Sequence, residues 1–103
     1  MTWATEYITE LQAGKTIKFR PRGNSMEPLV KSGDLCTVEP TNNYNKPIVG
    51  DVVLCTVRGQ DYFHLVKQCR GLQYQIGNNR GFVNGWISSD KIYGRLTQIE
   101  SDL

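Results

Sequence analysis

The sequence predicts a mostly β protein, in which antiparallel strands form a coiled or barrel-like sheet and one short helix precedes them. Two observations support this prediction. Short runs rich in β-branched and aromatic residues are separated by turns of glycine, aspartate and asparagine. Apolar residues at helical spacing occur near the N-terminus, before the first of these runs. Because the turns follow one another closely, we expect neighbouring strands to run antiparallel.

The predicted helix covers about residues 2–13. Its apolar residues recur at helical spacing, Thr2 is placed to cap its start, and Gly14 is placed to end it. We expect the apolar stripe to pack on the domain rather than on a membrane, because the polar face is acidic. The stripe consists of Trp3, Tyr7, Ile8 and Leu11.

The strands are expected after this helix. Gly33-Asp34 and Gly50-Asp51 each stand immediately before a β run, so both pairs are predicted to be turns that begin a strand. Residues 40–47 and 77–85 are rich in asparagine or glycine and are predicted to be loops. The predicted strands are residues 16–20, 35–39, 52–57, 62–69, 72–76 and 92–99.

Length and composition favour one small domain, residues 1–103, with a net charge of +2. This charge is too small to indicate a nucleic-acid partner. No segment approaches the about 20 apolar residues of a membrane span and no signal peptide is evident, so we expect a soluble, cytoplasmic protein. One histidine and three separated cysteines do not form a metal motif, so no metal or cofactor is expected. The cysteines, Cys36, Cys55 and Cys69, are predicted to be reduced thiols within strands.

The segment RPRGNSMEPLVKSGD, residues 20–34, contains Ser25 in a loop where it could act as a nucleophile. A serine requires a neighbouring base to take its proton. His64 is disfavoured, because strand alternation places it on the opposite face from Lys67 and a lone strand histidine usually packs. Lys67 shares its face with Phe63, Leu65 and Cys69, and an amine in apolar surroundings has a lowered pKa. These residues alone leave open a lysine that simply extends to water.

Several segments together resemble the signal peptidase I and LexA-like superfamily of serine–lysine peptidases. GNSMEP is similar to the nucleophile segment, GD shortly after it to the following turn, and GDVV to the next strand opening. VKQCRG is similar to the strand that carries the lysine base, and GNNR to the Gly-Asp-Asn-Arg segment of signal peptidases. They occur in the order of the family, at residues 23–28, 33–34, 50–53, 66–71 and 77–80.

The resemblance implies a LexA/signal-peptidase fold, with Ser25 as nucleophile, Lys67 as general base and the Ser25 backbone N–H in the oxyanion hole. It further implies an oxyanion and cleft region of Gly23, Asn24, Met26 and Pro28, and a supporting loop of Gly77, Asn78, Asn79 and Arg80. This chain departs from the pattern at four positions. Gly23 lacks the polar donor that some members carry, Asn78 replaces an aspartate, and Val83 and Gly85 replace the serine and aspartate that help to orient the lysine.

The function expected from the resemblance is a soluble serine–lysine endopeptidase that cleaves a polypeptide through an acyl-enzyme. Self-cleavage at Ala13-Gly14 is disfavoured. Residues 16–20 are predicted to form a strand, so too little chain remains between that bond and Ser25 for the bond to return to the serine. The alternative is a non-catalytic binding or inhibitory module, of the kind that a small viral protein could carry. Such a module would grip a partner protein or a small anionic ligand, with Arg80 as one contact. A regulatory subunit that docks through its N-terminal helix and a homodimer are also left open.

Overall fold

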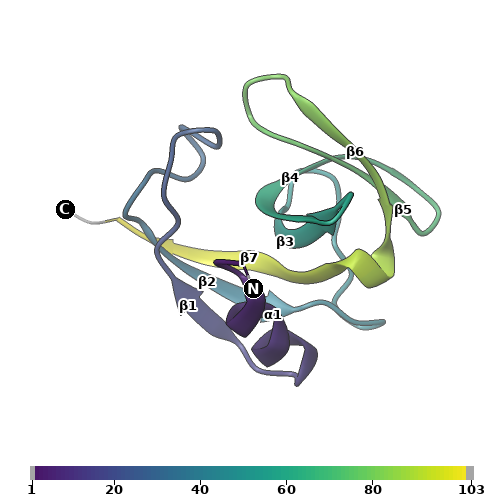
Figure 1. Cartoon of the computed structure of the whole chain (residues 1–103), viewed down its shortest axis with the longest axis horizontal. Helices are drawn as coiled ribbons and strands as arrows, with labels where there is room; N and C mark the ends of the chain where they lie inside the picture. Colours follow the sequence, from purple (N-terminus) through teal and green to yellow (C-terminus); the bar gives the residue numbers. More distant parts are fainter. Residues whose placement is uncertain (1, 102–103) are drawn as a thin grey trace.

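The computed structural model describes residues 2–101, and the remaining positions of the predicted domain, residue 1 and residues 102–103, lie outside it. A short helix precedes one seven-stranded antiparallel sheet, which curls into a half-barrel (Figure 1). The prediction of a mostly β, barrel-like fold is confirmed. The elements are α1 (Thr5–Gln12), β1 (Ile17–Phe19), β2 (Leu35–Pro40), β3 (Val52–Val57), β4 (Gln60–Arg70), β5 (Gln73–Gly77), β6 (Val83–Ser88), a 3-10 turn (Ser89–Lys91) and β7 (Ile92–Glu100).

The strand order in the sheet is β1-β2-β7-β3-β4-β5-β6, so the last strand is inserted between the second and the third. Register shifts interrupt four of the strand pairs, and each extra residue bends the strand that carries it. One shift lies in β4 between Val66 and Gln68, at Lys67. The bends bring β6 back toward β3, so that β3 to β6 form the most strongly curled part of the sheet.

Strand β6 was not predicted, and the expected loop at residues 77–85 is correspondingly shorter. Its sequence contains Asn84 and Gly85, which have low strand propensity. The strand forms because its backbone completes a ladder with β5, in which Tyr74 pairs with Ile87 and Gln75 with Trp86. Tertiary pairing therefore overrides the local signal here.

Helix α1 begins three residues later than predicted, and no side chain caps its first turn. Thr2 instead accepts a hydrogen bond from the Ala4 N–H (3.2 Å). Gly14, with φ of +85°, ends the helix as expected. The helix packs over Gly94 of β7, where a Cβ would lie 2.9 Å from a Leu11 methyl carbon. No helix within residues 2–101 has the length and apolar character that a membrane crossing requires.

The two Gly-Asp pairs form the same turn. In each, the aspartate N–H donates to the carbonyl three residues earlier, and its carboxylate accepts the N–H of that same residue. Gly33 and Gly50 occupy the third position with φ of +93° and +96°, as a type II turn requires. Asp51 also forms a two-bond pair with Arg95, with Nε–Oδ2 and Nη2–Oδ1 distances of 2.9 and 3.1 Å. These turns fix the starts of β2 and β3.

Two clusters of buried side chains lie on the sheet. One joins α1, β1, β2 and the loop after β1, and includes Leu11, Phe19, Met26, Val30 and Phe63. The other fills the curl of β3 to β7, and includes Val53, Val66, Tyr74, Ile76 and Ile87. All three cysteines are free and lie within strands, as predicted, with two buried and Cys69 exposed.

Candidate functional site

Ser25 lies in the loop between β1 and β2, which the structure holds at both ends. The Gly33 N–H donates to the Pro21 carbonyl (3.1 Å), and the Gly23 N–H donates to the Ser32 hydroxyl (3.3 Å). Within the loop, the side chains of Met26 and Val30 are buried in the first cluster. The loop is therefore anchored by packing on one side, and Ser25 remains half-buried at its surface.

The segment between β5 and β6 supports the turn that carries Ser25. The Asn79 N–H donates to the Ser25 carbonyl (3.0 Å), and the Asn79 amide donates to the Glu27 carbonyl (3.0 Å). Arg80 Nε donates to the Asn24 carbonyl (3.2 Å). Asn78 folds the segment itself, because its Oδ1 accepts the N–H groups of Arg80 and Phe82 (2.8 and 3.0 Å). The predicted supporting loop thus contacts the serine turn through backbone carbonyls.

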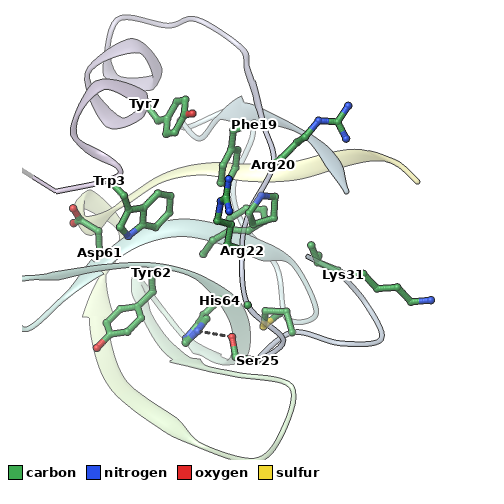
Figure 2. Close-up of a pocket in the computed structure, with 15 residues that line it drawn as sticks. Trp3, Tyr7, Phe19, Arg20, Arg22, Ser25, Lys31, Asp61, Tyr62 and His64 are labelled. Atoms are coloured by element: carbon green, nitrogen blue, oxygen red, sulfur yellow. Dashed lines mark hydrogen bonds between the residues drawn. The ribbon is translucent and has the colours of Figure 1, made fainter. Parts of the chain in front are cut away.

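Ser25 is hydrogen-bonded to His64, not to Lys67. The Ser25 Oγ lies 3.3 Å from His64 Nε2, and His64 Nδ1 lies 2.8 Å from Asn84 Oδ1 (Figure 2 shows the first of these contacts). An amide oxygen can only accept, so Nδ1 carries the proton and donates it to Asn84. Nε2 of the neutral ring then accepts a hydrogen bond from the Ser25 hydroxyl. The three side chains come from the serine loop, β4 and β6.

The surroundings of His64 favour its neutral form. Burial lowers the pKa of His64 below its ordinary 6.5, and the hydrogen bond with Asn84 opposes this effect without cancelling it. The ring also packs beside Tyr62, with centroids 4.9 Å apart. With its pKa below 6.5, the His64 ring is uncharged at neutral pH, and its Nε2 is held toward Ser25 as an acceptor.

Lys67 lies at the bulge of β4. Val66 pairs with Ile76 and Gln68 with Gln75, which leaves Lys67 between two paired positions. Its side chain crosses Gly77, with Cε 3.0 Å from where a Cβ on Gly77 would lie. Lys67 is half-buried, and its side chain forms no hydrogen bond or ion pair with any residue from 2 to 101. The following residues, Cys69 included, are exposed, so the apolar surroundings expected from that cysteine are not present.

The remaining predicted cleft residues surround Ser25 unequally. Met26 is buried, whereas Gly23, Asn24 and Pro28 are exposed. Gly23 has φ of +99°, which an ordinary side chain rarely adopts. The backbone N–H of Ser25 has no hydrogen-bond acceptor within the described residues. This N–H is therefore available to a ligand at the serine hydroxyl.

A pocket with a cavity volume of about 450 Å³ opens beside the Ser25–His64 pair. Trp3, just before helix α1, and Tyr7 within the helix contribute to its wall, and Phe19 of β1 contacts both rings and Phe63 of β4 (Figure 2). Its lining residues are Trp3, Tyr7, Phe19, Arg20, Pro21, Arg22, Gly23, Ser25, Met26, Val30, Lys31 and 61–64. The Ser25–His64 pair therefore lies at the edge of a cavity whose wall includes several aromatic rings.

Comparison with known families agrees with this fold. The family described as peptidase S24-like matches residues 2–83, most of the chain. The chain belongs to the peptidase S24-like family. The resemblance predicted from the sequence to the LexA and signal peptidase superfamily is thereby confirmed. No curated protein matches the chain. The match of the S24-like family covers Ser25, His64 and Lys67, and it ends one residue before Asn84.

Sequence reasoning did not identify Asn84 and set His64 aside. Asn84 fell within the segment predicted to be a loop, so no sequence signal placed its side chain beside His64 of β4. The argument against His64 compared its face with that of Lys67, although alternation says nothing about which of the two faces the serine. The signal that could have found His64 was its neighbour on the same face, Tyr62, which marks a partly buried aromatic setting.

Proposed function

We propose that the chain is a serine endopeptidase that cleaves a polypeptide through an acyl-enzyme at Ser25, with His64 as general base. The observation that carries this proposal is the hydrogen-bonded series Ser25–His64–Asn84, with distances of 3.3 and 2.8 Å. A nucleophile, a base and a group that orients the base are the parts that serine acyl transfer needs. Membership of a peptidase family favours the same reaction.

Each residue has a defined task in the proposed reaction. The Ser25 oxygen attacks the carbonyl carbon of the scissile peptide while its proton passes to His64 Nε2. Asn84 accepts from Nδ1–H throughout and so keeps Nε2 aimed at the serine. The imidazolium then gives its proton to the departing amine, and a water molecule hydrolyses the acyl-enzyme by the reverse steps. The distance of 3.3 Å is long for a hydrogen bond and is expected to shorten when substrate binds.

The oxyanion would be stabilised by the backbone. The Ser25 N–H has no acceptor among the described residues, and Gly23 contributes no side-chain donor. Because one oxyanion donor is worth about 100-fold or more in rate, a site with a single donor is expected to be slow.

Lys67 remains the competing base. It was predicted from the resemblance, and its amine is available to move because no described residue binds it. The geometry favours His64, which is already hydrogen-bonded to Ser25 and held in the required tautomer. A role for Lys67 would require its side chain to leave Gly77.

The deciding experiment compares three variants with the wild-type protein. Each is incubated with a fluorophosphonate, which phosphonylates activated serines with loss of fluoride, and with a mixture of defined peptides analysed by mass spectrometry. Ser25→Ala removes the nucleophile. His64→Gln removes the base and keeps a side chain of similar size, and Lys67→Met removes the amine and keeps a side chain of similar length.

We expect Ser25→Ala to lose both labelling and cleavage. His64→Gln should reduce both by about 100-fold or more, the usual contribution of a general base. Lys67→Met should stay within about threefold of wild type, since it would remove no group of the reaction. The reverse pattern would assign the base to Lys67. A wild-type protein that neither reacts with the probe nor cleaves any peptide would refute the peptidase proposal.

A further inference from the structure

The pocket beside Ser25 has the properties of a substrate subsite. We propose that it holds a bulky apolar side chain of a polypeptide that carries an acidic residue next to it. The part of this inference that concerns cleavage rests on the proposed function, whereas the part that concerns binding does not. The occupant is identified from the aromatic wall, the exposed cations and the position of the cavity.

The wall of the pocket is built from aromatic rings that support one another. Phe19 stacks with Trp3 at a centroid distance of 5.9 Å, and it contacts Tyr7 at 5.1 Å and Phe63 at 5.0 Å. Met26 and Val30 add buried aliphatic surface. A cavity of about 450 Å³ lies within the size range of ligand pockets and accommodates a large side chain together with adjoining backbone.

Trp3 makes this surface available to a ligand. It remains 52% exposed although its ring stacks on Phe19. The chain before it is held in place, because the Thr2 hydroxyl donates to the Asp61 carboxylate on β4. An indole fixed at the rim of an apolar cavity gains from contact with an apolar partner, as aromatic anchors do in binding sites.

The charges around the pocket favour an acidic neighbour. Arg22 and Lys31 line it, are exposed, and form no side-chain hydrogen bond or ion pair with any residue between 2 and 101. Asp61 is the carboxylate among the lining residues, and its oxygens accept from the Thr2 and Thr56 hydroxyls. The groups left to meet a ligand are therefore cations, which attract a substrate carboxylate.

The position of the pocket links binding to the reaction. Ser25 and His64 belong to its lining, so an occupant enters within reach of the serine hydroxyl (Figure 2). Trp3 and Tyr7 come from the N-terminal segment, far from the serine in sequence. The N-terminal segment, Trp3 together with helix α1, is thus inferred to determine specificity in addition to covering the sheet.

Binding is tested without turnover in the Ser25→Ala protein. Three short dye-labelled peptides are titrated by fluorescence anisotropy, and they differ only in a central pair of Phe-Glu, Ala-Glu or Phe-Lys. We expect Phe-Glu to bind about tenfold or more tightly than Ala-Glu, from burial of the ring, and more tightly than Phe-Lys. Trp3→Ala should weaken Phe-Glu by about tenfold, and Arg22→Glu should reverse the preference between Glu and Lys.

Matched controls lie outside the pocket. Tyr44→Ala removes a fully exposed aromatic ring (101% exposed), and Lys18→Glu reverses an exposed charge on β1. Neither should change the three affinities. Equal binding of the three peptides, or no binding of any of them, would overturn the subsite. So would a Phe-Glu affinity that Trp3→Ala leaves unchanged.

Cleavage by the wild-type protein separates this inference from the proposed function. Cuts close to Phe, Tyr, Trp or Leu in an acidic context support both, and Trp3→Ala should remove this preference. Selective binding without any cleavage retains the subsite and refutes the peptidase. Cleavage beside small residues only, insensitive to Trp3→Ala, retains the peptidase and refutes the subsite.

Discussion

Replacing Asn84 by aspartate tests how the base is controlled. Asn84 Oδ1 accepts from His64 Nδ1 at 2.8 Å, and an aspartate of the same shape would keep that hydrogen bond while adding a negative charge. At present burial lowers the pKa of His64 below 6.5. The variant changes the charge beside the ring and little else.

The size of the effect follows from this distance. An opposite charge within about 4–6 Å raises the pKa of a histidine by about 1 to 3 units, which corresponds to about 1.4 to 4 kcal/mol. Catalysis needs the neutral His64 ring, so the rate is lost as the pH falls through the pKa that His64 has in the folded protein. The acid limb of the Asn84→Asp profile should therefore lie about 1 to 3 pH units higher, and at pH values between the two limbs the variant should be slower.

The assay is the fluorophosphonate labelling rate of Ser25, measured from acid to alkaline pH for both proteins. Asn43→Asp introduces the same charge in an exposed part of the loop before β3 and should leave the profile in place. An unchanged acid limb in Asn84→Asp would refute His64 as the base, because the titrating group would then be remote from position 84. A shift toward lower pH would refute the electrostatic argument.

Three further predictions concern the scaffold. Gly77→Ala should lower the free energy of unfolding by about 1 to 3 kcal/mol in urea titrations, because its Cβ would lie 2.3 Å from the Phe82 carbonyl oxygen. Asp51→Asn should cost about 1 to 3 kcal/mol by the same measurement through loss of charge-assisted bonds with Arg95, whereas Asn43→Asp should change stability little. A thiol reagent at mildly alkaline pH should modify Cys69 alone in the folded protein and all three cysteines in denaturant, since burial raises the pKa of the other two thiols to about 11 and 12; rapid modification of a second thiol in the folded protein would contradict this prediction.

Much of the fold was predictable because short local sequence motifs determine its turns. Gly33 and Gly50 each precede an aspartate, and the resulting turns mark the starts of two strands in sequence and structure alike. Strand β6 was not predictable in this way. Asn84 and Gly85 give it a loop-like composition, and only its ladder with β5 makes it a strand. The order of strands in the sheet likewise depends on contacts between distant segments.

In the candidate site, too, some parts depend on local sequence and others on contacts between distant segments. Ser25 and residues 77–80 could be predicted as site residues because each lies in a contiguous motif of the chain. The choice of base depends on which side chain a curled sheet carries to the serine, and alternation along one strand cannot decide that. In the structure Lys67 crosses Gly77, while His64 meets both Ser25 and Asn84. Two features that the sequence pattern did not predict produce this arrangement: the bulge of β4 at Lys67, and strand β6, which carries Asn84.

The hairpin of β5 and β6 aligns both halves of the proposed reaction. Its loop binds the carbonyls around the nucleophile through Asn79 and Arg80, and its second strand carries Asn84, which holds His64. Ser25 and His64 belong to segments that are far apart in the chain, so their alignment depends on this shared support. A change that shifts the hairpin should therefore misplace nucleophile and base together, whereas a change confined to Asn84 should affect the base alone.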